Sequence, residues 1–419
     1  MDKQFGMTRE ERSWVLYDVA NSAFVLVMVT ALMPIYYKDV IAASQPAAVS
    51  TANWGFANAA ASLALALLAP VLGAMADYPG RKKAFFVAFL LLGLAFTLTL
   101  PLVASGQWLL CLTLFLLARV GWAGANLFYD AFLVDVASPG RMDLISSRGY
   151  AWGYIGSVIP FVAIIGLLFT GGMDQGLPVR ETRIGFVLVA LWWLLFSLPA
   201  IRRLRQLHSL PAHPAPVRDS FRRLGQFVGE VRRHPRVFVF LLAYFFYIDG
   251  VDTIISMATA YGRDLGFSPT LLIAVLLFIQ IVAWPFALLY GRLAARFSTR
   301  RMLMAGIGVY VLVTLLAFLL PWVAPGPAKI ALFWLIAVLV ASSMGGIQAL
   351  SRSFYGRLIP PAQSAEFFGF YNVFGKFAAI VGPLLMGVVT RLSGDSRWGV
   401  LSLLILFALG AWFLRRVEE

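Results

Sequence analysis

The sequence contains little charge and almost no thiol or imidazole. Only 13% of its 419 residues are Asp, Glu, Lys or Arg, whereas soluble domains carry about 25%. Its one cysteine, Cys111, excludes an internal disulfide. Its three histidines all fall between residues 208 and 234, outside the apolar runs. No metal site is therefore expected in those runs.

Phosphate-binding motifs are also missing. No G-x-x-x-x-G-K-[ST] motif occurs in the chain, and such a loop is what cradles the phosphates of ATP in P-loop proteins. The sequence therefore argues against an ATP-driven pump, and we expect no cofactor.

Long apolar runs make up most of the chain, since 60% of the residues are hydrophobic. Crossing the hydrocarbon core takes about 20 apolar residues, and twelve stretches satisfy this length. In lipid every backbone polar group must be satisfied within the segment, so runs of this length predict helices. The predicted fold class is an all-α membrane protein with twelve transmembrane helices. The spans are expected at 13–37, 51–75, 83–103, 107–136, 147–172, 183–201, 236–262, 269–295, 301–321, 328–354, 364–390 and 398–414.

The net charge of +14 is distributed unevenly along the chain. If the N-terminus is cytoplasmic, the predicted inner segments hold 25 of the 34 Lys and Arg residues and the outer loops hold seven. The positive-inside rule then places both termini in the cytoplasm. This distribution explains the charge without a nucleic-acid partner. We expect a monomer in the inner (plasma) membrane, in contact with membrane lipids.

The longest polar stretch, residues 202–236, divides the spans into two sets of six. We therefore predict a six-helix bundle over 1–201, a cytoplasmic linker over 202–235 and a second bundle over 236–419. Within the linker, apolar residues such as Val217, Phe221 and Leu224 recur at helical spacing between arginines. This pattern predicts an amphipathic basic helix on the anionic inner leaflet. Binding of a protein or nucleic acid by the arginines is the alternative.

The two halves of the chain resemble each other, which indicates an internal duplication. Asp18 and Asn21 match Asp249 and Asp252 at an offset of 231 residues. At an offset of 222, residues 124–139 match residues 346–361. Equivalent helices run in the same direction, which predicts two pseudo-symmetric bundles related by a parallel repeat. The second match pairs Asn126 with Gln348, Asp130 with Arg352, and Asp135 with Arg357.

The loop "GAMADYPGRKK" (73–83) resembles the inner-loop signature of the major facilitator superfamily, apart from Tyr78, which stands where a basic residue is usual. Its tight turn places a carboxylate near a basic residue and a neighbouring helix end. We interpret Asp77, Gly80 and Arg81 as parts of a conformational latch. A role in topology alone would explain the basic residues but not Asp77. The second copy, "GRLAARFSTRR" (291–301), has Ala295 at the acid position and Ser298 at the second glycine.

Three further stretches resemble the bacterial branch of this superfamily that is related to the fungal vacuolar effluxers of autophagy. They are "WVLYDVANSAF", "FFYIDGVDTI" and "GGIQALSRSFYGRLIPPAQSAEFFGFYNVFGKFAAIVGPLLMG" (345–387). The resemblance covers essentially the whole chain. It implies a major facilitator fold and a solute transporter that works by alternating access, with amino-acid efflux known for the fungal relatives.

Two carboxylates, Asp249 and Asp252, lie one helical turn apart near the middle of a predicted span. An ionised group at the bilayer centre costs about 2.5–3.5 kcal/mol on insertion scales. Two close carboxylates repel, which favours proton uptake by one of them. We interpret them, together with Asp18, as candidates for proton coupling. Ion pairs that only fix helix packing are the alternative.

Other polar residues within the spans are candidates for binding the solute, and Arg119 and Lys376 are charges that suit a substrate carboxylate or the acids above. Charges of opposite sign at equivalent positions suggest a gate at the inner ends, unless these ends are simply solvated. The candidate substrate-binding residues are Asn21, Arg119, Asn126, Tyr247, Gln348, Asn372 and Lys376, and the candidate gate or latch residues are Asp77, Gly80, Arg81, Asp130, Asp135, Arg352, Arg357 and Glu366.

These features predict a secondary transporter, not an enzyme. We expect proton-coupled efflux of a small polar or zwitterionic solute. The aromatic content of 14% also suits an exporter of lipid-like or drug-like amphiphiles, which is the main alternative. An intramembrane enzyme with paired aspartates and a channel are weaker alternatives.

Overall fold

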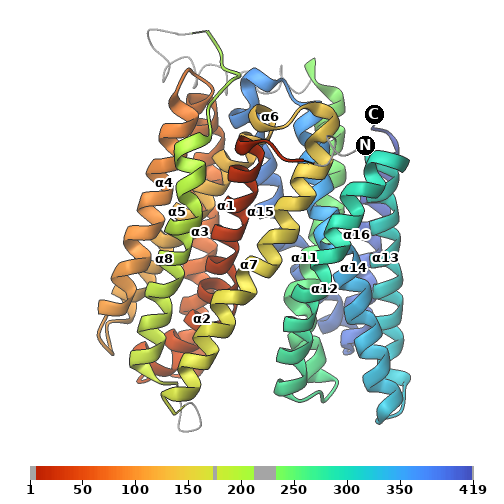
Figure 1. Ribbon diagram of the computed structural model, residues 1–419. Coiled ribbons are helices and arrows are strands. Elements are labelled where there is room, and N and C mark those ends of the chain that lie inside the picture. The colour runs from red at the N-terminus through yellow and green to blue at the C-terminus, as the bar shows by residue number, and fades with distance from the viewer. Residues whose placement is uncertain (1–5, 173–176, 212–232, 418–419) are drawn as a thin grey trace. The chain divides into compact units, whose positions relative to one another are not determined.

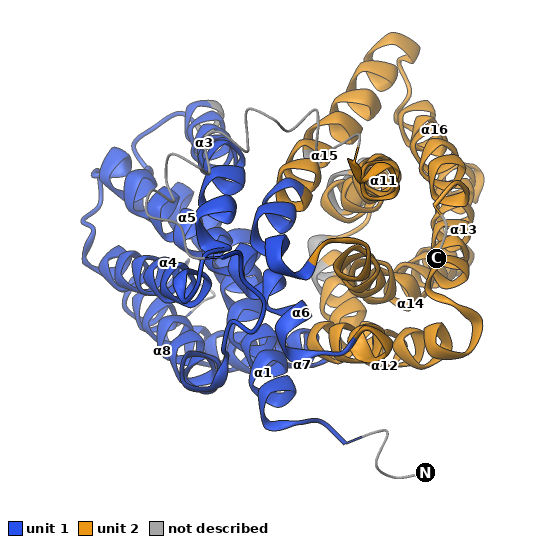
Figure 2. Ribbon diagram, turned by 90° about the horizontal axis from the view of Figure 1, so that it is seen from above, with its two compact units in different colours: residues 1–138, 152–224, 361–370 blue, residues 139–151, 225–360, 371–419 orange. Residues whose placement is uncertain are grey.

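The computed structural model describes residues 6–172, 177–211 and 233–417 (Figure 1). This part of the chain contains twelve helices that are long and apolar enough to cross a membrane, which confirms the predicted number of spans. It divides into two compact units (Figure 2). Unit 1 comprises Met1–Ser138, Trp152–Leu224 and Pro361–Phe370, and unit 2 comprises Pro139–Ala151, Gly225–Pro360 and Tyr371–Glu419.

Unit 1 is built mainly from the first half of the sequence. Its first span begins at Arg9, where Thr8 and Glu11 form a capping box in which each side chain accepts from the other's backbone N–H. In the core, α1 packs on α8, and α5 packs on both α3 and α4. The elements are α1 (Arg9–Phe24), π-helical Val25–Ala31, α2 (Leu32–Tyr36), π-helical Tyr37–Ile41, α3 (Ala47–Ala76), α4 (Arg81–Thr99), α5 (Trp108–Ala131), α6 (Leu133–Val136) and α8 (Val179–Arg203).

Unit 2 is built mainly from the second half. Prolines occupy the first position of three of its helices, where a missing N–H costs nothing and the fixed φ suits the helix. In its core α14 packs on α12 and α13, and α16 packs on α11 and α13. The helices are α11 (Pro235–Asp264), α12 (Pro269–Phe297), α13 (Thr299–Leu319), α14 (Pro327–Leu358) and α16 (Ser396–Arg415).

Two helices are divided between the units. Helix α7 (Met142–Thr170) begins in unit 2 and continues into unit 1, and α15 (Ser364–Ser393) begins in unit 1 and continues into unit 2. Figure 2 shows this change of colour along α15. Each unit therefore contains the first turns of a helix from the other half of the sequence.

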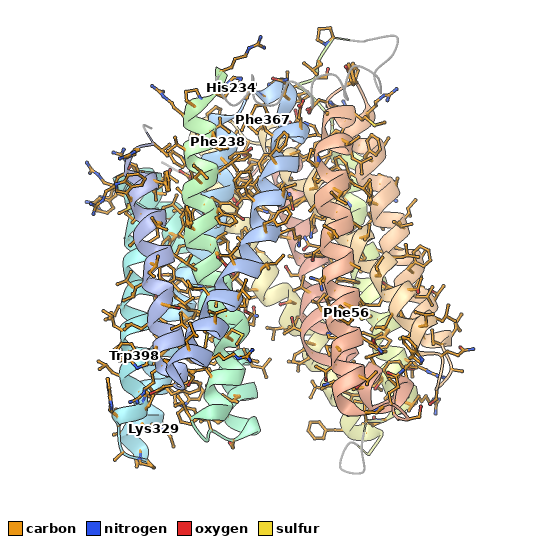
Figure 3. All side chains as sticks on the ribbon, turned by 180° about the vertical axis from the view of Figure 1, so that it is seen from behind. Phe56, His234, Phe238, Lys329, Phe367 and Trp398 are labelled. Carbon is orange, nitrogen blue, oxygen red and sulfur yellow. The ribbon has the colours of Figure 1, made fainter. Side chains whose placement is uncertain are left out.

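Large apolar side chains cover the outward faces of the helices. Phe56 on α3, labelled in Figure 3, is 72% exposed, and Leu67 on the same helix is 68% exposed. Within unit 2, Figure 3 places His234 and Phe238 at one end, and Lys329 and Trp398 at the other. Exposed apolar faces between polar ends are those of a protein embedded in lipid.

The linker differs from its surroundings. Helix α8 ends at Arg203 and α11 begins at Pro235, close to the expected limits of 202 and 235. Residues 204–211 form no helix. The predicted amphipathic helix falls mainly on residues 212–232, which lie outside the described residues.

Candidate functional site

The Asp77 carboxylate caps the first turn of α15. Asp77 follows the last residue of α3 and is fully buried. Its Oδ1 accepts a hydrogen bond from the backbone N–H of Ala365 at 2.8 Å, and its Oδ2 accepts one from that of Glu366 at 2.9 Å. The first N–H groups of a helix have no partner within it and carry partial positive charge. Asp77 supplies both the acceptors and the opposite charge.

Burial of the Asp77 side chain disfavours its ionised form. It raises the pKa of Asp77 to about 7, although Lys82 and the two backbone N–H groups lower the pKa and Glu366 raises it further. The carboxyl group therefore changes its charge close to neutral pH.

Lys82 forms a second contact around the same loop. Gly80, with φ of 74°, precedes α4, and this left-handed conformation explains the glycine. Lys82 is fully buried, and its Nζ lies 2.8 Å from Asp135 Oδ2 and 2.7 Å from Ser364 Oγ. Arg81, the first residue of α4, is half-buried.

The start of the linker is bonded to these same residues, and we call residues 204–210 the strap. Asp135 Oδ1 accepts from the backbone N–H groups of Leu207 at 3.0 Å and His208 at 2.9 Å. The side chain of Gln206 accepts from Lys82 N and donates to Ala76 O. The N–H of Leu210 donates to Asp77 O at 2.9 Å. The strap thus closes over the loop that carries Asp77 and Lys82.

In unit 2 a different carboxylate collects the polar contacts. Asp143, at the start of α7, lies 2.8 Å from Arg357 of α14. It also accepts from Thr299 Oγ1 at 2.6 Å and from Ser353 Oγ at 2.5 Å. These partner groups come from α13 and α14, so the contacts join the start of α7 to two other helices.

Arg352 lies next to this cluster on α14 and is buried. Its guanidinium donates to Ser146 Oγ at 3.0 Å and to Ser146 O at 3.2 Å, and lies over the ring of Tyr150 at 4.4 Å. Of the residues predicted to form a gate, Asp135 therefore pairs with Lys82, and Arg357 pairs with Asp143. Asp130 is half-buried on α5 of unit 1.

Asp249 lies at the middle of α11 and is fully buried. Its Oδ1 accepts from the backbone N–H of Gly382 on α15 at 2.7 Å. Its Oδ2 has no hydrogen-bond partner among the described residues, and the Thr253 side chain lies close to the carboxyl group. A Cβ on Gly382 would lie 2.0 Å from Thr253 Oγ1 and 2.5 Å from Asp249 Oδ1. The contact therefore requires glycine.

Asp252 lies one turn further along α11 and is half-buried. It interacts electrostatically with Asp249 and with Lys376, which is also half-buried on α15. The structure thus brings together three of the charged residues that the sequence singled out.

Tyrosines from three helices surround this region of unit 2. Tyr244 stacks on Tyr371 with ring centroids 4.2 Å apart, and Tyr371 also contacts Tyr355. The Tyr247 hydroxyl lies 2.6 Å from Ser351 Oγ. Two other candidates, Gln348 on α14 and Asn372 on α15, are half-buried.

The equivalent residues of unit 1 are arranged differently. Asn21 donates to Tyr17 O at 2.9 Å and lies 3.5 Å from Asp18 Oδ1, so here the turn pairs an amide with a carboxylate. Asn126 is half-buried on α5, and its Oδ1 has no hydrogen-bond partner among the described residues. Arg119 is half-buried near the middle of the same helix.

Comparison with known proteins decides the family. The chain matches the model of the family described as "Vacuole effluxer Atg22 like" over residues 46–140 and 135–419. The chain belongs to this family. It is 46% identical over 423 residues to the MFS-type transporter YxiO of Bacillus subtilis, covering 100% of this chain and 96% of that protein.

A fungal member of the family is more distant. Autophagy-related protein 22 of Botryotinia fuckeliana is 27% identical over 311 residues, which cover 66% of this chain and 50% of the fungal protein.

Solved structures show the same fold. The major facilitator transporter FucP in its outward conformation aligns with a TM-score of 0.73 at 15% identity. A bacterial homologue of the iron transporter ferroportin in the outward-facing state aligns with a TM-score of 0.70 at 14% identity. Each alignment covers 98% of both chains. The predicted family and fold are confirmed. This Atg22-like chain is a multi-pass transporter and not an enzyme, as the sequence predicted.

Several polar residues of these clusters were not predicted from the sequence, namely Asp143, Ser146, Thr299, Ser353 and the residues of the strap. The offset of 222 that aligns Pro139 with Pro361 places Asp143 opposite Ala365, but the sequence did not indicate that Ala365 takes part in a contact. No comparable pattern indicates the strap.

Proposed function

We propose that this chain is a proton-coupled secondary transporter that exports a small polar or zwitterionic solute by alternating access. In this proposal it acts as a monomer in the inner (plasma) membrane, with both termini in the cytoplasm. The observation that carries it is the buried carboxyl group of Asp249 at the middle of α11.

The surroundings of Asp249 suit a proton that binds and leaves. One of its oxygens is bonded to a backbone amide, and the other has no hydrogen-bond partner among the described residues. An ionised carboxylate within the membrane costs about 2.5–3.5 kcal/mol on insertion scales. Binding of a proton removes that charge, so its gain and loss can be coupled to a change of conformation.

Asp252 and Lys376 support a zwitterionic solute. They are opposite charges on neighbouring helices and are both half-buried. A solute ammonium group suits Asp252 and a solute carboxylate suits Lys376, because each carries the charge opposite to that of the side chain it would contact. In this proposal Asp18, Asn21, Arg119, Asn126, Tyr247, Gln348 and Asn372 contribute further polar contacts along the path.

Export of amphiphiles is the second candidate. The stacked rings of Tyr244, Tyr371 and Tyr355 favour it, because aromatic faces offer apolar area to a hydrophobic solute. Their hydroxyl groups suit polar solutes as well, so the two candidates are separated by experiment.

Alternating access requires contacts that break when one side opens. The Asp77 contact joins the loop between α3 and α4 to a helix of the other half of the sequence. We propose that Asp77, Gly80, Arg81, Asp135 and Glu366 hold this contact in one state and release it in another. Asp130, Arg352 and Arg357 are assigned to the same function.

Flux in liposomes tests the proposal. Purified protein is reconstituted with a pH-sensitive dye inside, and radiolabelled amino acids or a fluorescent amphiphile are added under a pH gradient. We expect amino-acid flux that moves protons, and loss of this coupling in Asp249→Asn. Asp395→Asn, at a half-buried ion pair with Arg397 at the start of α16, is the matched control. Proton-coupled flux of the amphiphile alone would favour the second candidate, and unchanged coupling in Asp249→Asn would contradict the role of Asp249.

A further inference from the structure

The two signature loops share a positive φ at one matched position, although their sequences differ there. At an offset of 218 residues, loop 73–83 matches loop 291–301, and Gly80 matches Ser298. Gly80 has φ of 74°, and Ser298 has φ of 87°. Ser298 is the one non-glycine residue with positive φ among those described, and such a conformation is uncommon for a residue with a side chain. The two residues differ in ψ, which is −10° at Gly80 and 148° at Ser298, so the second loop keeps the positive φ but not the left-handed helical conformation of the first.

The helices that the two loops contact, α15 and α7, are also equivalent to each other in the repeat. A Cβ on Gly73 would lie 2.3 Å from the carbonyl oxygen of Ala365, and a Cβ on Gly291 would lie 3.3 Å from that of Asp143. Ala365 and Asp143 occupy the same position in the repeat, at the start of α15 and α7. A Cβ on Gly291 would lie closer still to Ser147, at 2.6 Å from its Cβ. Each loop glycine thus faces the first turns of the equivalent helix.

The acid of the first loop has no equivalent in the second. The position of Asp77 is taken by Ala295, which is exposed. The carboxylate in the second loop's contact comes instead from the helix, since Asp143 binds Thr299 in the first turn of α13 and Arg357 in the last turn of α14.

We propose that Asp143 is a positioning residue that supplies the carboxylate of a second latch, with the polarity of the first latch reversed. In unit 1 the loop carries the carboxylate and the helix donates its backbone N–H groups. In unit 2 the helix carries the carboxylate, and Thr299, Ser353 and Arg357 donate to it. This inference rests on the proposed alternating access, because a latch has a function only if the ends of the helices separate.

The repeat gives a physical reason for the carboxylate of the second contact to lie on the helix and not in the loop. Arg357 stands where the first half has Asp135. In the first half Asp135 pairs with the loop residue Lys82, so a basic residue at the equivalent place needs an acid nearby. Asp143 meets that need, and removing it would leave a guanidinium that is largely enclosed without its counter-charge.

Cysteine labelling tests the proposal without solute or proton gradient. Cys111 is the single cysteine and is buried, so Cys111→Ala with Ser147→Cys gives one reporter. Ser147 is fully buried beside Gly291, and its hydroxyl has no hydrogen-bond partner among the described residues. We expect Asp143→Asn to raise the rate of labelling by a water-soluble maleimide by on the order of tenfold, because the variant loses the charge-assisted hydrogen bonds that hold the start of α7.

A double-mutant cycle separates the latch from a general loss of packing. Arg357→Gln should raise the labelling rate by a similar factor. The double variant Asp143→Asn with Arg357→Gln should be labelled little faster than either single variant, because each substitution removes the same interaction. Thr299→Val, which removes one donor, should give a smaller increase and remains available if Asp143→Asn does not fold.

Two controls complete the experiment. Asp395→Asn should leave labelling of the reporter unchanged, because its ion pair with Arg397 lies at the start of α16 and involves no residue of α7, α13 or α14. Asp143→Asn in the chain that keeps Cys111 should leave labelling of this buried thiol unchanged, whereas general unfolding would raise both rates. Unchanged labelling at Ser147→Cys, or equal acceleration at Cys111, would overturn the second latch. The proposed function is tested separately by flux.

Discussion

Oδ1 of Asp77 accepts a 2.8 Å hydrogen bond from the backbone N–H of Ala365, which lies in the other half of the sequence. Oδ2 accepts from the next N–H along the helix, at 2.9 Å. One buried carboxylate therefore satisfies two donors at the start of α15.

Asp77 should make stability depend on pH near neutrality. Burial raises the pKa of its carboxyl group to about 7, so the folded protein holds the proton more tightly than the unfolded chain does. The contribution of Asp77 is then greatest at low pH and is lost as the pH rises through about 7. We expect thermal unfolding from about pH 6 to about pH 8 to show a decline of at most about 1.4 kcal/mol per pH unit from this group.

Asp77→Asn is the matched variant for that measurement. Asparagine cannot ionise in this range, so the difference in stability between the two proteins should change with pH through about 7. A difference that stays constant across the range would show that Asp77 does not titrate there.

Lys82→Met should be one of the most destabilising single changes in unit 1. Lys82 and Asp135 are both fully enclosed at their side chains and lie 2.8 Å apart. Removing one partner of a buried ion pair costs roughly 3–5 kcal/mol, because the other charge stays buried. Thermal unfolding should show a smaller loss of stability for the double variant Lys82→Met with Asp135→Leu than for Lys82→Met alone. A larger loss in the double variant would argue against an unpaired charge as the cause.

Gly382→Ala should disturb the surroundings of Asp249. The added Cβ would lie 2.0 Å from Thr253 Oγ1, and overpacking of this kind typically costs about 1–3 kcal/mol. Gly387→Ala in the same helix is the control, because nothing lies within 4 Å of its Cβ position. Proton-coupled flux should fall in the first variant and persist in the second. Equal flux in both would place Gly382 outside the coupling site.

Gln206→Ala should weaken the strap more than His208→Ala. The Gln206 side chain makes hydrogen bonds of 3.2, 3.1 and 3.4 Å to Lys82, Ala76 and Asp77, each contributing about 0.5–1.5 kcal/mol. The His208 side chain is 45% exposed, so its contact with Asp135 contributes at most about 1 kcal/mol, and its backbone bond survives the substitution. Unfolding midpoints in the reverse order would show that the imidazole holds the strap.

The membrane spans were largely predictable from hydropathy. Spans predicted at 183–201 and 364–390 correspond to α8 (Val179–Arg203) and α15 (Ser364–Ser393). The largest shift at a helix start concerns α7, expected from 147 and observed from Met142. Its first turns carry Asp143 and Ser146, whose polarity lowers a hydropathy average although both side chains are buried against other polar groups.

The polar contacts were harder to predict, because their partners are distant in the chain. The loop motif indicated Asp77, because it places a carboxylate in a tight turn. Nothing in the loop indicates that the partners of Asp77 are the N–H groups of Ala365 and Glu366. The opposite signs at Asp135 and Arg357 suggested that these ends form a pair. In the structure Asp135 pairs with Lys82 within unit 1, and Arg357 pairs with Asp143 within unit 2. Symmetry within a single sequence shows which positions are equivalent and not which side chains meet.

The division of α15 between the units has a consequence for biosynthesis. Residues 361–370 belong to unit 1, so the first six spans emerge from the ribosome long before the segment that completes their unit. Until then Asp77 lacks both of its amide donors from α15, and Lys82 lacks Ser364. A nascent chain halted after the linker should consequently be a better substrate for membrane quality-control proteases than one halted beyond residue 370.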